Sequence, residues 1–172
     1  MKMSLPEIDL IGTGNLATSL ATALEQNGLV INRIYGRSIK SAQQIADNLY
    51  QASATTSLDF SNSKARVFLL AIADSAIEEI ARELVLPANA VVAHTSGSRS
   101  LSVLGYTASP NIGVFYPLQT FSKLKRVNFD NVPILIEGDN NFTKKMLHAL
   151  ARKISNTVSE ASSRQEHATS SW

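Results

Sequence analysis

A short apolar stretch near the start of the chain leads directly into a glycine motif and then into a helical pattern. The stretch Ile8–Ile11 is followed by Gly12, Gly14 and Ala17, which match the spacing G-x-G-x-x-G/A. Leucines then recur at every fourth position, as on one face of a helix: Leu16, Leu20 and Leu24. A strand, a glycine turn and a helix in this order favour binding of a dinucleotide pyrophosphate. The alternative is an ordinary glycine turn in some other α/β protein.

Each small residue of the motif has a physical role in such a site. Gly12 permits a tight turn, Gly14 lets a pyrophosphate approach the backbone, and Ala17 lets the helix lie close to the strand. The unpaired N–H groups and the positive dipole end of the helix would then face the phosphates. The motif therefore predicts both where a cofactor binds and which end of the helix it meets.

Composition excludes several classes of function. The 172 residues, of which 44% are hydrophobic and 17% charged, are typical of one globular domain with its own core. A net charge of +2, without a basic run interleaved with aromatic residues, gives no support for nucleic-acid binding. The chain has no cysteine, which excludes disulfides and a cysteine nucleophile, and its three histidines lack the spacing of metal ligands.

The longest apolar run, residues 67–73, is too short to cross a bilayer, and the N-terminus does not resemble a signal peptide. We therefore expect a cytoplasmic protein without a membrane partner.

Strand and helix patterns alternate along the chain. Apolar or β-branched runs predict strands at residues 8–11, 29–35, 54–56, 66–72, 90–94, 112–115 and 133–136. Helices are predicted from the glycine turn to residues 27–28, after an N-cap at Ser38, after a capping box at residues 75–78, over 101–104, and over 142–154. The alternation indicates an α/β fold, with a doubly wound, mostly parallel sheet in a single three-layer domain.

From about Ser159 the pattern ends, so we expect residues 1–158 to form the domain. Residues 159–172 would be a tail or the cut start of a further domain.

The residues at the end of the second predicted strand favour NADP(H) over NAD(H). Sites for NAD carry an acidic residue about 20 positions past the glycines, which binds the ribose 2′-hydroxyl. Here that position is Arg37, and no acid occurs between Gly28 and Lys40. A guanidinium binds a 2′-phosphate through paired hydrogen bonds, and Ser38 and Lys40 could add to the contact. The alternative is that Arg37 is only a solvated charge at a strand end.

In an open α/β sheet the ligand crosses the carboxyl ends of the strands, so the loops there hold the candidate residues. Ala71 and Ala73, after the fourth strand, are small enough to let a nicotinamide ribose pass over the backbone. His94, which ends the fifth strand, could act as a general acid toward a carbonyl or imine that receives hydride, or be a structural histidine. Ser96 could bind a carboxylate or the nicotinamide amide, although residues 95–97 also suit a turn. His94 and Ser96 are thus the candidate catalytic residues. Two weaker candidates follow the sixth strand: Tyr116 and Gln119.

Five segments of the chain together resemble a known family: residues 11–17, 35–38, 73–77, 94–97 and 113–123. They are similar to the Rossmann-like NADP oxidoreductases that carry a C-terminal helical domain of uncharacterised function. These proteins are relatives of pyrroline-5-carboxylate reductase and of the deazaflavin-coenzyme-dependent NADP oxidoreductases. The last two segments, HTSG and GVFYPLQTFSK, are far more specific than the glycine motif. The likeness extends over residues 7–158.

This resemblance implies a Rossmann-type domain that binds NADP(H). It places the pyrophosphate at the first turn, on Gly12, Thr13, Gly14, Asn15 and Leu16. It places the adenosine phosphate on Arg37 and Ser38. It brings the nicotinamide to two further loops, formed by Ala71, Ile72, Ala73 and Asp74, and by His94 to Ser96. The resemblance assigns no catalytic role to any residue, because the family's substrate is not established.

Members of that family continue into helices that usually build a dimer interface and one wall of the substrate cleft, whereas this sequence ends at Trp172. The first hypothesis is therefore the cofactor-binding domain of an NADP-dependent oxidoreductase acting on an unknown small molecule, with a homodimer as one implication. The second is an NADP(H)-binding sensor or interaction module without catalysis. The third is an inactive truncated fragment.

Overall fold

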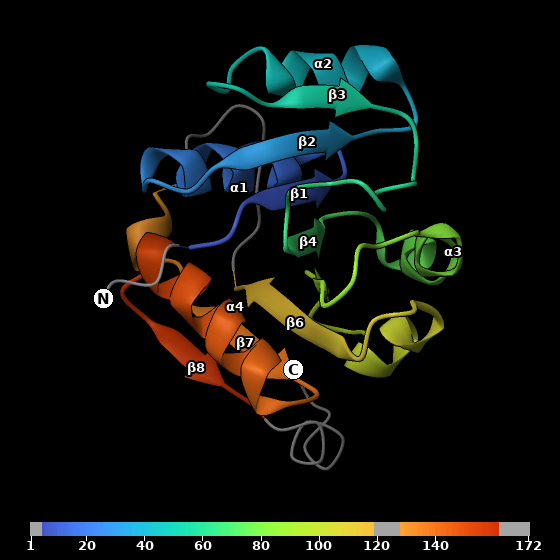
Figure 1. Ribbon diagram of the computed structural model, residues 1–172. Helices are drawn as coiled ribbons and strands as arrows, with labels where there is room; N and C mark the ends of the chain where they lie inside the picture. Colours follow the sequence, from blue (N-terminus) through green and yellow to red (C-terminus); the bar gives the residue numbers. More distant parts are fainter. Residues whose placement is uncertain (1–4, 119–127, 162–172) are drawn as a thin grey trace.

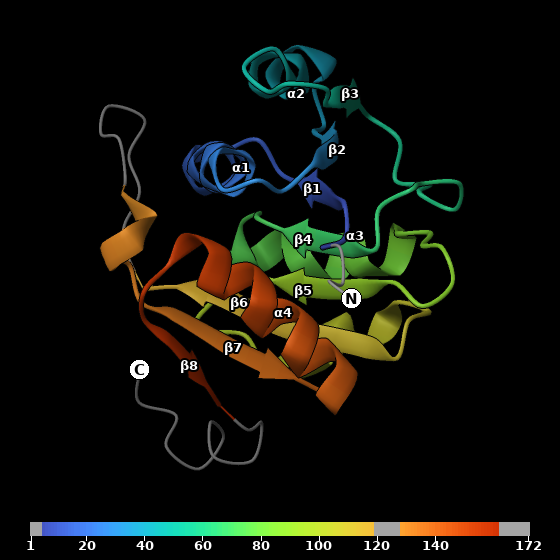
Figure 2. The same ribbon diagram turned by 60° about the vertical axis from the view of Figure 1, so that its left-hand side comes forward.

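Eight β-strands form one sheet in the residues that the computed structural model describes, 5–118 and 128–161. Their order across the sheet is β3-β2-β1-β4-β5-β6-β7-β8 (Figures 1 and 2). The strands are β1 (Ile8–Ile11), β2 (Ile31–Tyr35), β3 (Ser53–Thr55), β4 (Val67–Leu70), β5 (Val91–His94), β6 (Asn111–Pro117), β7 (Ile134–Gly138) and β8 (Val158–Glu160). Every neighbouring pair is parallel except β6 with β7. The α/β fold with a mostly parallel sheet is therefore confirmed.

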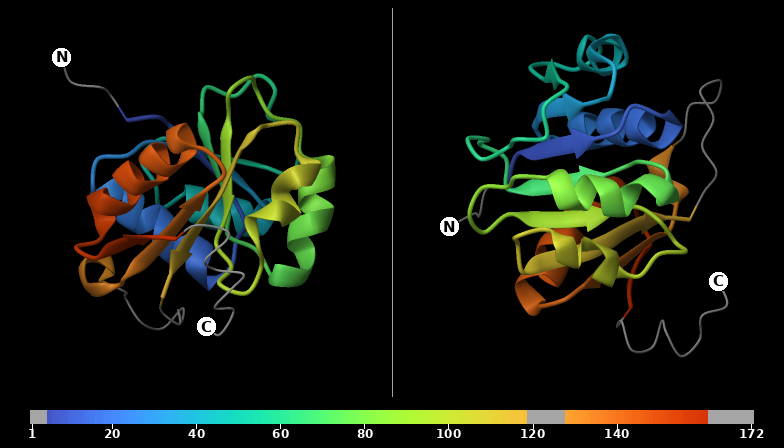
Figure 3. Two further views of the ribbon diagram at one scale, coloured as in Figure 1. Left: turned by 90° about the horizontal axis from the view of Figure 1, so that it is seen from below. Right: turned by 90° about the vertical axis from the view of Figure 1, so that its right-hand side faces the viewer.

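Helices cover both faces of this sheet. The α-helices are α1 (Asn15–Gln26), α2 (Ile39–Ala46), α3 (Ile77–Glu83) and α4 (Asn141–Ile154), and the 3₁₀ helices are η1 (Asp74–Ala76), η2 (Leu101–Tyr106) and η3 (Phe129–Asn131). Apolar side chains of α1, α2 and α4 share one core with one face of the sheet, and those of α3 and η2 share a second core with the other face. Figure 3 shows α1 and α4 on one side of the strands and α3 and η2 on the opposite side. The domain therefore has the predicted three layers.

The helices of the described residues are short. The longest, α4, has 14 residues, and none is both long and apolar enough to pass through a bilayer. Their apolar faces are instead used in the two cores, as the spacing of Leu20 and Leu24 on α1 illustrates.

The strand order reverses between β1 and β4. From β1 the chain proceeds outward through β2 to β3, then returns to place β4 on the other side of β1. The segments that leave β1 and β4 therefore diverge to opposite faces of the sheet. In doubly wound sheets the crevice that binds ligands lies at such a reversal, outside the carboxyl ends of the strands. The fold places most of the candidate residues at this end of the sheet.

Two of the predicted helix caps are present and one is not. Gly28, with φ of +88°, follows the end of α1, and the Ser38 hydroxyl accepts a hydrogen bond from the Ser41 N–H at the start of α2. The predicted capping box at residues 75–78 is wrong, because α3 begins at Ile77 without a side-chain cap. The carboxylate of Asp74, which could have capped this helix, accepts a hydrogen bond from the Ser98 hydroxyl instead.

The last strand, β8, was missed from the sequence. It pairs with β7 in parallel, and flanking backbone hydrogen bonds join the Ile134 N–H to Thr157 O and the Ala161 N–H to Ile136 O. Within the described residues, regular structure ends at Glu160, one residue past the expected point near Ser159, and the expected boundary after residue 158 falls inside this strand. The strand carries little apolar signal because it lies at the sheet edge, with Ser159 and Glu160 exposed. Residues 162–172 of the expected tail lie outside the described residues.

A carboxylate is buried in the first strand. Asp9 is fully buried in β1, and its Oδ2 accepts a hydrogen bond of 2.5 Å from the Ser63 hydroxyl, which ties the loop before β4 to the sheet. Burial raises the pKa of Asp9 above its ordinary value of 3.8, although the hydrogen bond from Ser63 partly opposes this. The folded protein therefore holds a proton on Asp9 more readily than the unfolded chain does.

This burial makes the stability of the fold depend on pH. The stabilisation due to protonated Asp9 is complete below pH 3.8 and is lost as the pH rises through the folded-state pKa. The Asp9→Asn variant carries no such charge, so at pH 7 we expect its melting temperature to be roughly 2–4 °C higher, the shift that about 1 kcal/mol gives in a domain of this size. Thermal unfolding by circular dichroism between pH 3 and pH 8 should show the difference shrinking in acid. The exposed Asp139→Asn serves as control, and an equal gain at all pH values would contradict the assignment.

Candidate functional site

The first turn of the chain admits only glycine at its first position. Gly12 has φ of +134°, and a Cβ added there would lie 2.0 Å from the carbonyl oxygen of Ala71. The Gly12 N–H donates to Tyr35 O at 2.9 Å, so this backbone is fixed between β2 and the end of β4. The predicted tight turn is thus explained by a backbone approach that a side chain would prevent.

The turn presents the N-terminus of α1 toward solvent. Gly14 is the N-cap of α1 and is exposed, and a Cβ added to it would meet no atom within 4 Å. No side chain caps this helix end, and its first turn holds no acid. Ala17 is fully buried in the core beneath. The helix end is therefore open and electropositive, as an anion site requires.

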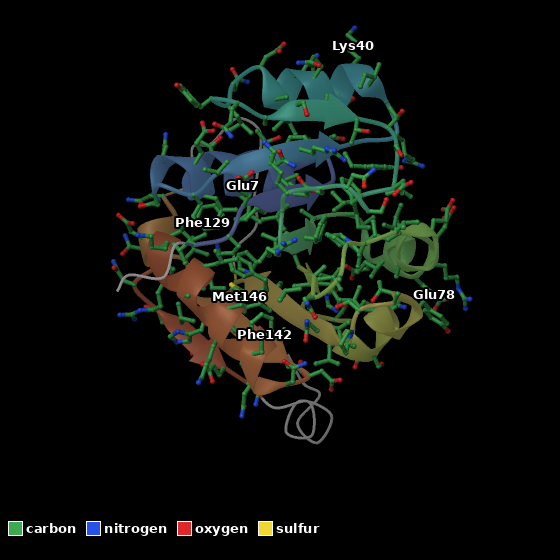
Figure 4. All side chains as sticks on the ribbon, in the orientation of Figure 1. Glu7, Lys40, Glu78, Phe129, Phe142 and Met146 are labelled. Carbon is green, nitrogen blue, oxygen red and sulfur yellow. The ribbon has the colours of Figure 1, made fainter. Side chains whose placement is uncertain are left out.

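The end of β2 lies beside this turn. A Cβ on Gly36 would lie 2.6 Å from the Thr13 methyl carbon, so the two loops are packed together. The four residues that follow, 37–40, are all exposed, and Figure 4 shows Lys40 pointing away from the body of the molecule at the start of α2. Arg37, Ser38 and Lys40 thus form an accessible cationic and hydroxyl-bearing segment next to the glycine turn.

A chain of hydrogen bonds joins the loops after β4 and β5. The Ser98 hydroxyl donates to Oδ2 of Asp74 at 2.6 Å, and the Ser96 and Ser98 hydroxyls lie 3.2 Å apart. The Ser98 N–H donates to Oγ of Ser96, and the Thr95 hydroxyl donates to Leu70 O at 3.1 Å. The Ser98 hydrogen bond is the main cause that lowers the pKa of Asp74, so this carboxylate is ionised at neutral pH.

The imidazole of His94 is enclosed within its own loop. The residue is fully buried, its Nδ1 accepts a hydrogen bond from the Ser96 N–H at 3.0 Å, and its Nε2 lies 3.1 Å from Ser100 O. Nε2–H must therefore be the donor to the Ser100 carbonyl, which defines a neutral tautomer. Burial is the main cause that lowers the pKa of His94, so the ring is uncharged at pH 7.

The end of β6 closes one side of this loop. A Cβ on Gly97 would lie 2.4 Å from the ring of Tyr116, which shows how closely the aromatic ring covers the backbone. Tyr116 thus contacts the predicted loop, whereas the other candidate after this strand, Gln119, lies outside the described residues. The resemblance motif at 113–123 is described only as far as Leu118.

The sheet register brings most of the predicted residues together. The last residues of four strands pair in one row, Tyr35 with Ile11, Ile11 with Leu70, and Leu70 with His94. The segments at 12–16, 37–38, 71–74 and 94–96 each begin at or just past this row. They therefore share one edge of the sheet, although Ala71 and Ser96 are largely buried there and Ala73 is exposed.

Two polar residues near this edge were missed from the sequence. Ser98 supplies the link between Asp74 and Ser96, and only its place in a serine-rich turn hinted at such a role. Glu137 lies in the same row as His94, two strands away through Val114. It is 1% exposed, and neither carboxylate oxygen has a hydrogen-bond partner within the described part of the chain. The sequence signal that could have identified Glu137 is its position as an acidic residue in the otherwise apolar strand β7.

The described residues contain no group of three or more histidine, aspartate or glutamate side chains able to hold a metal ion. The polar groups at this edge are instead hydroxyls, the imidazole of His94, backbone amides and the separate carboxylates of Asp74 and Glu137. Such a set suits an organic ligand with an anionic group at one end.

Comparison with known proteins agrees with the fold. The chain belongs to the Rossmann-like domain family, whose model matches residues 2–112. None of the curated proteins compared with the chain matches it significantly. The family therefore defines the class of the domain, a Rossmann-like dinucleotide-binding fold.

Several solved structures resemble this chain over almost its whole length. A Bacteroides fragilis protein, the "putative NADP oxidoreductase", is 37% identical with a TM-score of 0.85, and the match covers 96% of this chain and 64% of that one. A pyrroline-5-carboxylate reductase from Coxiella burnetii is 17% identical with a TM-score of 0.75, covering 95% and 61%. A prephenate dehydrogenase from A. aeolicus, solved with hydroxyphenyl propionate and NAD+, is 14% identical with a TM-score of 0.80, covering 96% and 63%. The chain thus spans less than two thirds of each of these proteins.

The contact between the first two loops can be tested by paired substitutions. Gly36→Ala places a methyl group against Thr13 Cγ2, so we expect it to lower the free energy of unfolding by about 1–3 kcal/mol. Thr13→Ser removes that carbon, and the double variant should recover most of the loss because the next atoms, Ser38 O and Ala42 Cβ, are 3.2 and 3.4 Å away. Urea unfolding of the four proteins measures the coupling. Additive effects would show that the two loops are not packed together.

Proposed function

We propose that this chain is the NADP(H)-binding domain of an NADP-dependent oxidoreductase that transfers hydride between the cofactor and a small molecule. The observation that carries the proposal is the glycine turn, in which the backbone of Gly12 lies against Ala71 and leaves the α1 N-terminus open at Gly14. The oxidoreductases among the similar solved structures support it.

The phosphate end of the proposed site is formed by the first two loops. The backbone of residues 12–16 and the dipole of α1 would hold the pyrophosphate. Arg37 and Ser38, exposed at the end of β2, would bind the adenosine 2′-phosphate, and Lys40 would add a more distant charge. An acid that would repel this phosphate is absent from residues 29–39. This charge distribution favours NADP(H) over NAD(H).

The nicotinamide end would lie over the loops after β4 and β5. When bound, the nicotinamide supplies or accepts the hydride. Ala71 to Asp74 would support its ribose, and Ser96 would orient the amide or the substrate. Both ring nitrogens of His94 are engaged by main-chain groups, so we assign this residue to shaping the loop rather than to proton transfer.

A second candidate function is cofactor binding without turnover. One observation favours it, namely that both ring nitrogens of His94 are engaged by main-chain groups. Hydride transfer also needs a substrate pocket closed against water. Turnover separates the two functions. NADPH oxidation with a panel of imines and ketones supports the oxidoreductase, whereas binding without oxidation supports a sensor or interaction module.

Substitution of Arg37 tests the cofactor preference. In the unaltered chain NADPH should bind roughly tenfold or more tightly than NADH, because a guanidinium forms charge-assisted hydrogen bonds with the 2′-phosphate. The Arg37→Asp variant should reverse this order, since a carboxylate repels the phosphate and accepts from the ribose hydroxyls. Titrations that follow the fluorescence of the reduced nucleotides measure both constants.

Lys64→Asp is the matched control, because Lys64 is exposed in the loop before β4, at the opposite edge of the sheet. It changes the net charge equally and should leave the preference as it is. An unchanged ratio in Arg37→Asp would remove the argument for NADP, and no binding of either nucleotide to the unaltered chain would overturn the whole proposal.

A further inference from the structure

A fixed negative charge stands where the nicotinamide half of the cofactor would lie. We propose that Asp74 makes this site distinguish the two redox states of the cofactor, so that NADP+ binds more tightly than NADPH. The inference rests on the proposed function, since it concerns the same site. It goes further by assigning a role to a side chain that makes no contribution to the phosphate end.

The position of Asp74 is set by its neighbours. Asp74 is the first residue of η1, in the loop that follows β4 at the carboxyl edge of the sheet, and it is exposed. Oδ2 accepts the Ser98 hydroxyl at 2.6 Å, and Ser98 in turn lies 3.2 Å from the Ser96 hydroxyl. The carboxylate is therefore held against the β5 loop rather than free to move in solvent.

The direction of these hydrogen bonds keeps the carboxylate charged. An ionised Asp74 can only accept hydrogen bonds, so the Ser98 hydroxyl is the donor to Asp74. The oxygen of Ser98 can then accept a hydrogen bond from the Ser96 hydroxyl. Both serines thus act as donors in a chain that ends on Asp74, and this arrangement stabilises the anion.

Nearby groups leave this charge without a direct ionic partner. Within the described ranges the ion pairs are Arg82 with Glu78 and His148 with Glu160, and neither includes Asp74. His94 is neutral, and Arg99 is the cation that acts on Asp74 from outside ion-pair distance. A ligand over this loop would therefore experience a negative field.

The two forms of the cofactor differ in the charge at this end. The oxidised nicotinamide ring is positively charged and the reduced ring is neutral, whereas the pyrophosphate and adenosine contacts are the same for both. Those common contacts cancel in the ratio of dissociation constants, which leaves the attraction of Asp74 for the charged ring. A fixed unit charge several ångströms away in a partly solvated site gives a preference on the order of three- to tenfold.

This preference has a chemical consequence. A site that binds the oxidised form more tightly makes the bound reduced form a stronger hydride donor, by linkage between binding and redox equilibria. Asp74 would thus favour reduction of the substrate on the protein.

Isothermal titration of the chain with NADP+ and with NADPH tests the proposal without a substrate. The unaltered chain should prefer NADP+, and Asp74→Asn should bring the ratio close to one while keeping a hydrogen-bond acceptor for Ser98. Ser98→Ala keeps the charge but releases the carboxylate, so an intermediate ratio is expected. Asp139→Asn is the matched control, since Asp139 is exposed and its N–H donates to Ile112 O at the opposite edge of the sheet.

A salt titration of the unaltered chain provides an independent test should Asp74→Asn not fold. Between about 0.1 M and about 1 M salt the Debye length falls from about 10 Å to about 3 Å, so the preference for NADP+ should shrink. A ratio that is equal in the unaltered chain and Asp74→Asn, or one that does not change with salt, would overturn the role of Asp74 alone. Failure of both nucleotides to bind would overturn the proposed function and this role with it.

Discussion

The architecture of the site depends on one backbone contact, the approach of Gly12 to the carbonyl of Ala71. The turn after β1 must cross the end of β4 to enter α1, and at φ of +134° it does so with no room for a side chain. This crossing lies where the strand order reverses, between β1 and β4. It therefore determines both the crevice and the direction of α1, whose N-terminus opens toward solvent at Gly14. A side chain at Gly12 would displace the crevice and the helix together.

Charge is distributed unequally along that crevice. The end near β2 carries Arg37 and Lys40 beside the positive end of α1, whereas the end near β4 carries the carboxylate of Asp74, fixed by Ser98. In the proposed site, the first end binds the phosphates and the second end responds to the charge of the nicotinamide. One strand further along, after β5, the buried ring of His94 organises its loop through two main-chain hydrogen bonds. Polarity of this kind suits a ligand with an anionic and a cationic end.

Much of the fold could be predicted from the sequence, because the features concerned are determined by residues that are close together in the chain. The glycine turn, the Ser38 cap and the alternation of strand and helix each depend on a few adjacent residues, and all are present. What the sequence did not reveal depends on distant partners. Strand β8 is defined by pairing with β7, and the Asp74 carboxylate accepts a hydrogen bond from a serine 24 residues away instead of capping α3. The hydrogen bonds of His94 likewise depend on how its loop folds back, which spacing alone does not specify.

The proposed cofactor site is tested most directly by a map of backbone amide shifts as NADP+ is added to the isotopically labelled chain. Saturable changes are expected at the amides of residues 12–16, at Arg37 and Ser38, and at the loops after β4 and β5, with the opposite sheet edge around Asn111 and Asp139 unaffected. Saturating NADP+ that leaves the Gly12 and Gly14 amides unmoved, or that moves only the opposite edge, would contradict it.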